Sequence, residues 1–321
     1  MIIKRKREVL KEGVNMKKMI KLICVVVLIL CLLVTCVSLY IGNYLYDYTL
    51  NPYSDHSLLQ QLALDEEKKE NAKAWMDENS QDVYITNKEN LKLHAYSIEQ
   101  KSDIYMIMVH GYRGEGLGLI SPIKKMKKKG YNILVPDLRG HGLSEGDYIA
   151  MGWDDRLDIM EWIDFILSQN KNANIILYGV SMGGATVMNV AGEKLPIQVK
   201  AIIEDCGYTS VWDIFKDHID MEPWQSELAL HVASLVTKMR AGYYLSDVQP
   251  IEQVKKSQTP ILFIHGNQDD FVPFDMLDEL YNAASCPKEK LVIHGAGHGD
   301  CDWVDSDLYY GTIDRFIKKY T

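Results

Sequence analysis

The segment Gly179-Val180-Ser181-Met182-Gly183 constrains the fold of this chain more than any other feature. An apolar run at 175–178 leads into it and is typical of a buried strand, and a helix-forming stretch follows from about 184 to 194. The turn between them must be tight, and glycines at both ends of the motif leave room for the crossing backbone. Ser181 is therefore expected at a helix N-terminus, where backbone N–H groups stabilise negative charge. A strand, G-x-S-x-G and helix in this order are typical of a nucleophilic serine.

A serine hydroxyl becomes a good nucleophile only when a base removes its proton and a carboxylate orients that base. The strand predicted at 261–264 runs into a loop that contains Asp269, and the strand predicted at 290–293 leads to His298 in a glycine-rich loop. Chains with this motif carry the acid and then the histidine after the serine. We therefore predict Asp269 as the orienting acid and His298 as the general base, with the adjacent Asp270 as an alternative acid.

Acyl transfer also requires two N–H donors that bind the developing oxyanion. The residue after the nucleophile supplies one of them, which predicts the Met182 N–H. The second comes from a loop after an early strand, and His110-Gly111-Tyr112 follows the strand predicted at 104–109, which points to the Tyr112 N–H. His110 is interpreted as a brace for this loop. This chemistry requires no metal and no organic cofactor.

An apolar run at 22–41 is long enough to cross a bilayer as a helix. Residues 1–21 carry eight Lys or Arg and two Glu, which predicts a cytoplasmic N-terminus and an extracytoplasmic remainder. No small-residue cleavage site follows the run, which favours an uncleaved, single-pass signal anchor in the cell membrane. Two alternatives are a start at Met16 and a lipidated Cys36.

Charge and segment order define the organisation that we expect. The whole chain has a net charge of −9 and its first 21 residues have +6, so the remainder carries −15, which argues against nucleic acid as a partner. After a predicted hairpin near 83–98, strands and helices alternate, which predicts an α/β fold whose mostly parallel sheet has helices on both faces. The expected segments are a basic cytoplasmic segment at 1–21, a transmembrane anchor at 22–41, a stalk and lead-in helix at 42–80, and an α/β domain at 81–321.

The segment at about 208–247 interrupts this alternation and is interpreted as a short helical cap. One of its predicted helices has an apolar stripe, which we expect either to pack onto the domain or to line an apolar acyl pocket. The stripe consists of Leu228, His231, Val232, Leu235, Val236 and Met239.

Together these motifs resemble the α/β-hydrolase superfamily, in particular its esterase, lipase and serine-aminopeptidase-like members. The resemblance covers roughly residues 83–320. Its marks are His110-Gly111-Tyr112, the run Pro136-Asp137-Leu138-Arg139-Gly140-His141-Gly142-Leu143-Ser144, the turn at Ser181, the loop from His265-Gly266 to Val272-Pro273, and Gly297-His298. It implies an α/β-hydrolase sheet and two-step acyl transfer on a small-molecule or lipid-like ester.

Two other functions stay open from the sequence. A serine exopeptidase of the same fold would need a pocket for a free α-amino group, and the cap residues Asp213, Asp217, Asp220 and Glu222 are candidates for it. A catalytically silent hydrolase fold used for binding is the second alternative. Members that share these motifs cleave esters, thioesters, amides and peptides, so the motifs do not identify the substrate.

Overall fold

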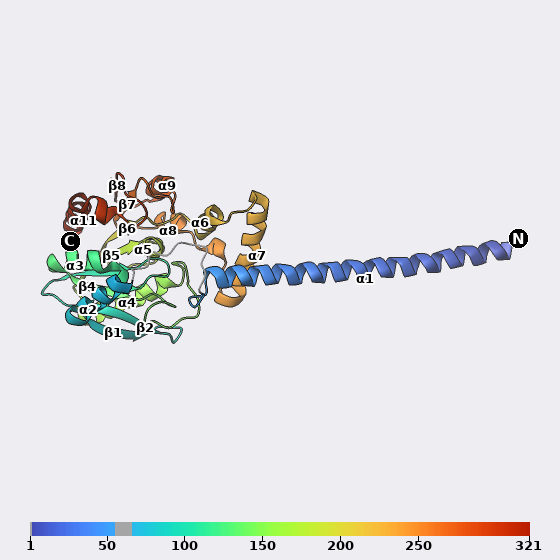
Figure 1. Cartoon of the computed structure of the whole chain (residues 1–321), viewed down its shortest axis with the longest axis horizontal. Coiled ribbons are helices and arrows are strands. Elements are labelled where there is room, and N and C mark those ends of the chain that lie inside the picture. Colours follow the sequence, from blue (N-terminus) through green and yellow to red (C-terminus); the bar gives the residue numbers. More distant parts are fainter. Residues whose placement is uncertain (1, 55–65) are drawn as a thin grey trace.

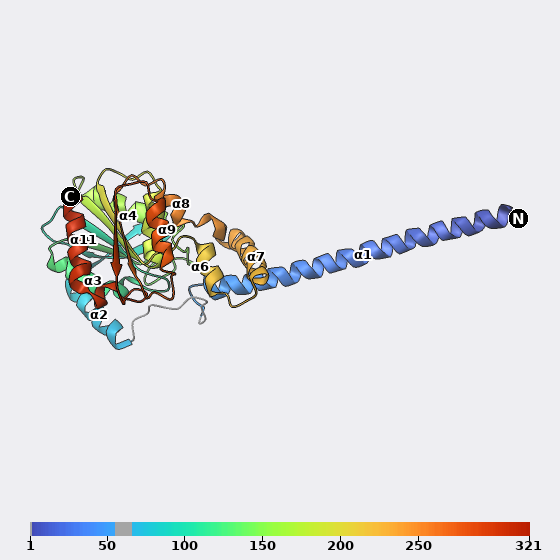
Figure 2. The ribbon, with the colours of Figure 1, turned by 90° about the horizontal axis from the view of Figure 1, so that it is seen from above.

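The computed structural model describes residues 2–54 and 66–321, and its body is a twisted eight-stranded sheet with helices on both faces (Figures 1 and 2). The strand order is β1-β2-β4-β3-β5-β6-β7-β8; β1 pairs with β2 and β2 with β4 in antiparallel fashion, and every other pairing is parallel. The strands are β1 Gln81–Thr86, β2 Lys92–Ile98, β3 Ile104–Val109, β4 Asn132–Pro136, β5 Asn174–Val180, β6 Val199–Asp205, β7 Ile261–Gly266 and β8 Lys288–Ile293. The predicted α/β fold with an antiparallel start is confirmed.

Two apolar clusters cover the two faces of the sheet, because successive side chains of a strand point to opposite faces. In β5, Ile175 and Leu177 belong to one cluster, and Ile176 and Tyr178 belong to the other. The first cluster is covered by α4 Asp155–Gln169, α5 Met182–Ala191, α8 Pro250–Val254 and α9 Asp275–Ala283, and the second by α2 Glu66–Asn79, α3 Ile120–Lys128, α10 Cys301–Val304 and α11 Ser306–Tyr320.

The N-terminal helix α1, Ile2–Thr49, projects far from the body (Figure 1). Among the described residues one helix is long and apolar enough to cross a membrane, and it is this one: its part Asn15–Thr49 contains an 18-residue window of mean hydropathy 3.3 with no residue buried. The predicted apolar helix at 22–41 is therefore present, whether as a membrane anchor or a signal sequence.

The last turns of α1 belong to the body. Tyr46 and Leu50 lie in the segment expected to be a stalk, yet they are only 3% and 1% exposed and pack into the first apolar cluster. The helix does not end at residue 42 because apolar side chains continue along one of its faces and meet the body there. Residues 55–65 of the expected stalk lie outside the described residues.

The segment between β6 and β7 forms helices, as expected of a cap: α6 Val211–His218 and α7 Pro223–Ala241, followed by the 3₁₀ turn η2 Leu245–Asp247. The expectation for the apolar stripe of α7 is wrong. Leu228, His231, Leu235 and Met239 are exposed, Val232 is half-buried, and of the six predicted residues Val236 alone is buried. The helix instead packs on the body through Leu230 and small side chains, which allow a close approach: Ser226, Ala229, Ala233, Ser234 and Thr237.

Candidate active site

Ser181 stands in the turn between β5 and α5, as the glycine spacing predicts. Its backbone has φ 58° and ψ −121°, a strained conformation for a residue with a side chain. A Cβ on Gly179 would overlap the carbonyl oxygen of Gly183, and a Cβ on Gly183 would overlap that of Val109. Glycine at these positions therefore permits the close crossing of backbone segments that keeps Ser181 in this conformation.

The loops after β7 and β8 bring an acid and a histidine to this serine. The Nε2 atom of His298 lies 2.8 Å from the Oγ of Ser181, and its Nδ1 atom lies 2.7 Å from Oδ2 of Asp269. Because a carboxylate only accepts hydrogen bonds, Nδ1 of His298 carries the proton and Nε2 is free to accept the serine proton. Asp270, the alternative acid, is exposed and takes no part in these contacts.

Asp269 is held as a carboxylate by four hydrogen bonds. Its Oδ1 accepts from the backbone N–H groups of Phe271 and Val272, both at 2.9 Å. Its Oδ2 accepts from His298 and lies 3.1 Å from Nε2 of His265. Burial alone would raise the pKa of Asp269, but the hydrogen bonds from His265 and His298 outweigh burial and hold this pKa well below its usual value.

His265 is a residue whose contact with the site the sequence analysis did not anticipate. It is fully buried at the end of β7, and its Nε2 also lies 3.1 Å from the carbonyl oxygen of Val272. Both neighbours of Nε2 are acceptors, so Nε2 carries the proton and fixes the Asp269 loop. The four-residue spacing from His265 to Asp269 in a short loop is the sequence signal that could have indicated this contact.

The loop after β3 lies against the serine. The Cα of Gly111 approaches it so closely that an added Cβ would lie 3.4 Å from the Cβ of Ser181. His110 is fully buried and accepts the N–H of Leu138 on Nε2 at 3.0 Å, which fits its predicted bracing role. Tyr112 follows Gly111 in this loop, and Met182 is the first residue of α5, whose first-turn N–H groups have no acceptor within the helix.

The end of α1 supports this loop from the other side. The Tyr112 hydroxyl donates to the carbonyl oxygen of Thr49 at 2.5 Å. Arg113 donates to the carbonyl oxygens of Asn51, at 2.9 Å, and of Ser54. The loop that carries one predicted oxyanion donor is thus tied to the chain just beyond the apolar helix.

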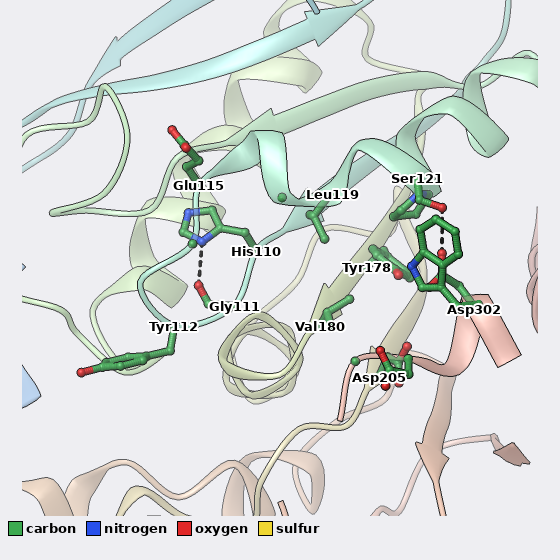
Figure 3. Close-up of a pocket in the computed structure, with 16 residues that line it drawn as sticks. His110, Gly111, Tyr112, Glu115, Leu119, Ser121, Tyr178, Val180, Asp205 and Asp302 are labelled. Atoms are coloured by element: carbon green, nitrogen blue, oxygen red, sulfur yellow. Dashed lines mark hydrogen bonds between the residues drawn. The ribbon is translucent and has the colours of Figure 1, made fainter. Parts of the chain in front are cut away.

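A cavity of about 330 Å³ opens beside the same loop (Figure 3). Gly111, Val180 and Tyr178 line it, together with four acidic residues, and no Lys or Arg is present among its described lining residues. The acidic residues are Glu115, Asp205, Asp300 and Asp302.

Asp205 is the buried acid of this cavity. The hydroxyl of Tyr309 donates to its Oδ2 at 2.7 Å, and Oδ1 has no hydrogen-bond partner among the described residues. Burial raises the pKa of Asp205 to about 6. The sequence analysis missed this residue because an aspartate at a strand end carries no distinguishing spacing.

One group of potential metal ligands is present in the described part of the chain. Single ligand atoms of Cys206, Asp269 and His298 lie within 4.8 Å of one another. The imidazole and carboxylate already bond each other, and burial raises the pKa of the Cys206 thiol, which opposes the thiolate that a metal would need. Hydrogen bonding accounts for this cluster.

The chain matches two protein-family models and is similar to curated proteins. Residues 100–248 match the model of the serine aminopeptidase (S33) family, and residues 224–301 match that of the dienelactone hydrolase family. The chain is 25% identical to the uncharacterized protein YqkD of Bacillus subtilis over 216 residues, which cover 67% of this chain and 71% of YqkD.

Solved structures with a similar fold include esterases and a peptidase. The Pyrococcus furiosus esterase Pf2001 superposes with a TM-score of 0.63 at 21% identity, over 77% of this chain and 93% of the esterase. The Pyrococcus horikoshii acylaminoacyl peptidase superposes with a TM-score of 0.54 at 18% identity, over 76% of this chain and 43% of the peptidase. The two proteins share the fold of this chain and differ in the substrate that their names state.

Proposed function

The chain belongs to the α/β-hydrolase superfamily, and from this premise we propose that it is a membrane-anchored serine hydrolase that cleaves carboxylic esters. The observation that carries the proposal is the unbroken hydrogen-bond relay from Ser181 Oγ through His298 to Asp269. A relay of this kind is what an activated serine nucleophile requires.

The proposed reaction has two steps. In the first, His298 takes the proton of Ser181 as the oxygen attacks the acyl carbon, and then gives that proton to the departing alcohol. In the second, His298 takes a proton from water as the water attacks the acyl-enzyme, and then returns that proton to the Ser181 oxygen as the acid leaves. Asp269 stays ionised throughout and stabilises the imidazolium that forms in each step.

The oxyanion of each step would be bound by the N–H groups of Met182 and Tyr112. Their positions, in the first turn of α5 and in the loop beside Ser181, support these roles. Loss of one such donor typically costs about 100- to 1000-fold in rate. No group beyond these residues is needed for the chemistry.

We also propose that α1 anchors the enzyme in the cell membrane, with the N-terminus cytoplasmic and the hydrolase body outside. The apolar, fully exposed stretch of α1 supports the span, and the eight basic residues within 1–21 support the orientation. The anchored position makes a lipid-like or cell-envelope ester the expected substrate class.

A serine exopeptidase or amidase is a second candidate, favoured by one observation. The acidic cavity beside the loop that contains Gly111 and Tyr112 could receive a protonated amine at the unpaired Oδ1 of Asp205 (Figure 3). The four cap acids considered for that role are exposed side chains, which do not form such a pocket: Asp213, Asp217, Asp220 and Glu222.

The esterase and the exopeptidase can be distinguished by the substrates that they hydrolyse. We expect the full chain in detergent to hydrolyse p-nitrophenyl esters of graded acyl length, with little turnover of aminoacyl p-nitroanilides. Ser181→Ala is the control for contaminating hydrolases. Faster turnover of the anilides than of the esters would contradict the esterase proposal and favour the exopeptidase.

A further inference from the structure

The cap helix α7 carries an apolar surface that the body does not cover. Trp224, Leu228, Leu235 and Met239, here called the outward stripe, follow one another at intervals of four, seven and four residues. Their exposed fractions are 68%, 58%, 48% and 67%. Large apolar side chains in a row on one helix face normally mark a contact with a partner or a membrane.

The outward stripe faces directly away from the hydrolase body. With 3.6 residues per turn, the stripe centres about 180° around α7 from the residues that pack on the body, such as Leu230, Ala233 and Thr237. Whatever covers the stripe must therefore approach from the side opposite the sheet.

Helix α1 contacts α7 directly after the end of its apolar run at 22–41. A Cβ on Gly42 would clash with the side chains of Val232 and Val236, and Arg240 donates to Asp47 at 2.8 Å. The residues of α1 at this contact begin immediately after the apolar run 22–41. At 1.5 Å per residue, Gly42 is about 1.5 Å beyond the end of that run, and Asp47 is about 9 Å beyond it.

Figures 1 and 2 show α7 running across α1 at the edge of the body nearest the projecting apolar helix. A bilayer around residues 22–41 would therefore lie next to α7, on the side that the outward stripe faces. Tyr40 and Tyr44 of α1 are exposed at the same level, and tyrosine and tryptophan are enriched where a membrane meets water.

We propose that the outward stripe of α7 lies in the surface of the same bilayer that α1 crosses. This inference rests on the proposed membrane span of α1 and adds a second, in-plane contact to it. The two contacts, one through the membrane and one along it, fix the tilt and rotation of the hydrolase body above the lipid.

Neighbouring residues of α7 provide matched probes of this contact. In the full chain with Cys24, Cys31 and Cys36 replaced by alanine, a nitroxide is attached to L228C or M239C. Matched labels at E227C and K238C occupy the adjacent, polar side of the helix. The protein is reconstituted into phosphatidylcholine vesicles, and each label is tested for collisions with oxygen, which concentrates in lipid, and with a water-soluble nickel chelate.

We expect the labels at 228 and 239 to collide mainly with oxygen and those at 227 and 238 mainly with nickel. Equal exposure of all four labels to nickel would overturn the inference. Protection of 228 from both reagents, with spin–spin broadening between labels, would also overturn it, because a second copy would then cover the stripe.

A label at V27C, in the middle of the apolar run, separates this failure from failure of the anchor. If Val27 is in lipid and the α7 labels are in water, the span stands and the in-plane contact is wrong. If the label at 27 is also in water, the span itself fails and the inference fails with it. The far-UV circular dichroism spectrum and melting temperature of each variant verify that the body is folded.

Discussion

Asp269 and Asp205 are both buried carboxyls, and the hydrogen-bond donors around each one decide whether it is ionised. Asp269 has four donors and keeps its charge, whereas Asp205, at the end of β6, has two side-chain donors, the hydroxyl of Tyr309 and the thiol of Cys301. Burial is common to both carboxyls, so the number of donors explains why the pKa of one falls and that of the other rises.

The raised pKa of Asp205 predicts a pH dependence of stability. In the unfolded chain this carboxyl ionises near its usual pKa of 3.8, but in the folded protein it does so at about 6. Above the folded pKa, the native state must hold a buried charge, at a cost of about 3 kcal/mol for a shift of this size. The stability contributed by the protonated form is therefore lost as pH rises from about 4 to about 6.

We expect Asp205→Asn to remove this loss. The difference in melting temperature between variant and parent should move in favour of the variant when the pH is raised from near 4 to near 7. Asp300→Asn, at an exposed carboxyl of the same cavity, is the control. A difference for Asp205→Asn that does not change with pH would contradict the assignment.

At the level of elements, the turn between β5 and α5 depends on glycine for space. Gly183→Ala should strongly destabilise the fold, because its Cβ would meet the backbone of Val109, which cannot move without disrupting β3. We expect a loss of more than about 3 kcal/mol of unfolding free energy, measured by chemical denaturation. Gly118→Ala has no atom within 4 Å of the new Cβ and should be close to neutral; an equally stable Gly183→Ala variant would show that the turn is not constrained.

Most strands and helices were predictable from the sequence because their signals are local. The apolar run before Ser181, the glycines around it and the alternation of strands with helices indicate the sheet without tertiary information. The orientation of α7 was not predictable, because the same sequence offers two faces. One is lined by larger apolar side chains such as Leu228 and Met239, the other by small ones such as Ala229 and Ala233, and the body binds the second.

The candidate site also contains residues that were predictable from the sequence and contacts that were not. Ser181, Asp269 and His298 were named from motif and order along the chain, and His298 lies within hydrogen-bond distance of both other side chains; their catalytic roles stay a prediction. The contacts of His265 and Asp205 were not predicted, since they depend on which loops the sheet brings together.

For the whole molecule, the important feature is that the apolar helix continues into the enzyme. Tyr46 and Leu50 fill the core, and the carbonyl oxygen of Thr49 accepts a hydrogen bond from Tyr112 in the loop beside Ser181. The end of α1 is therefore part of the folded body, and the apolar stretch of this helix continues directly into it.

Two truncated chains test whether the folded body needs the end of α1. A chain that begins at Asn43 keeps the buried side chains of Tyr46 and Leu50 and should stay folded and reactive, whereas one that begins at Asn51 loses both. We expect the shorter chain to lose roughly 3 to 6 kcal/mol of stability from the lost apolar burial, seen as a lower melting temperature and weaker labelling by a fluorophosphonate. Equal melting temperatures would show that the end of α1 is dispensable.

Covalent labelling with a fluorophosphonate shows whether Ser181 is a nucleophile that His298 activates. We expect the full chain to be labelled, Ser181→Ala to abolish labelling, and His298→Ala to slow it by about 10⁴-fold or more. Absence of labelling in the folded wild-type protein, or labelling that persists in Ser181→Ala, would show that Ser181 is not the activated nucleophile; the first result would favour a catalytically silent binding protein on the same fold.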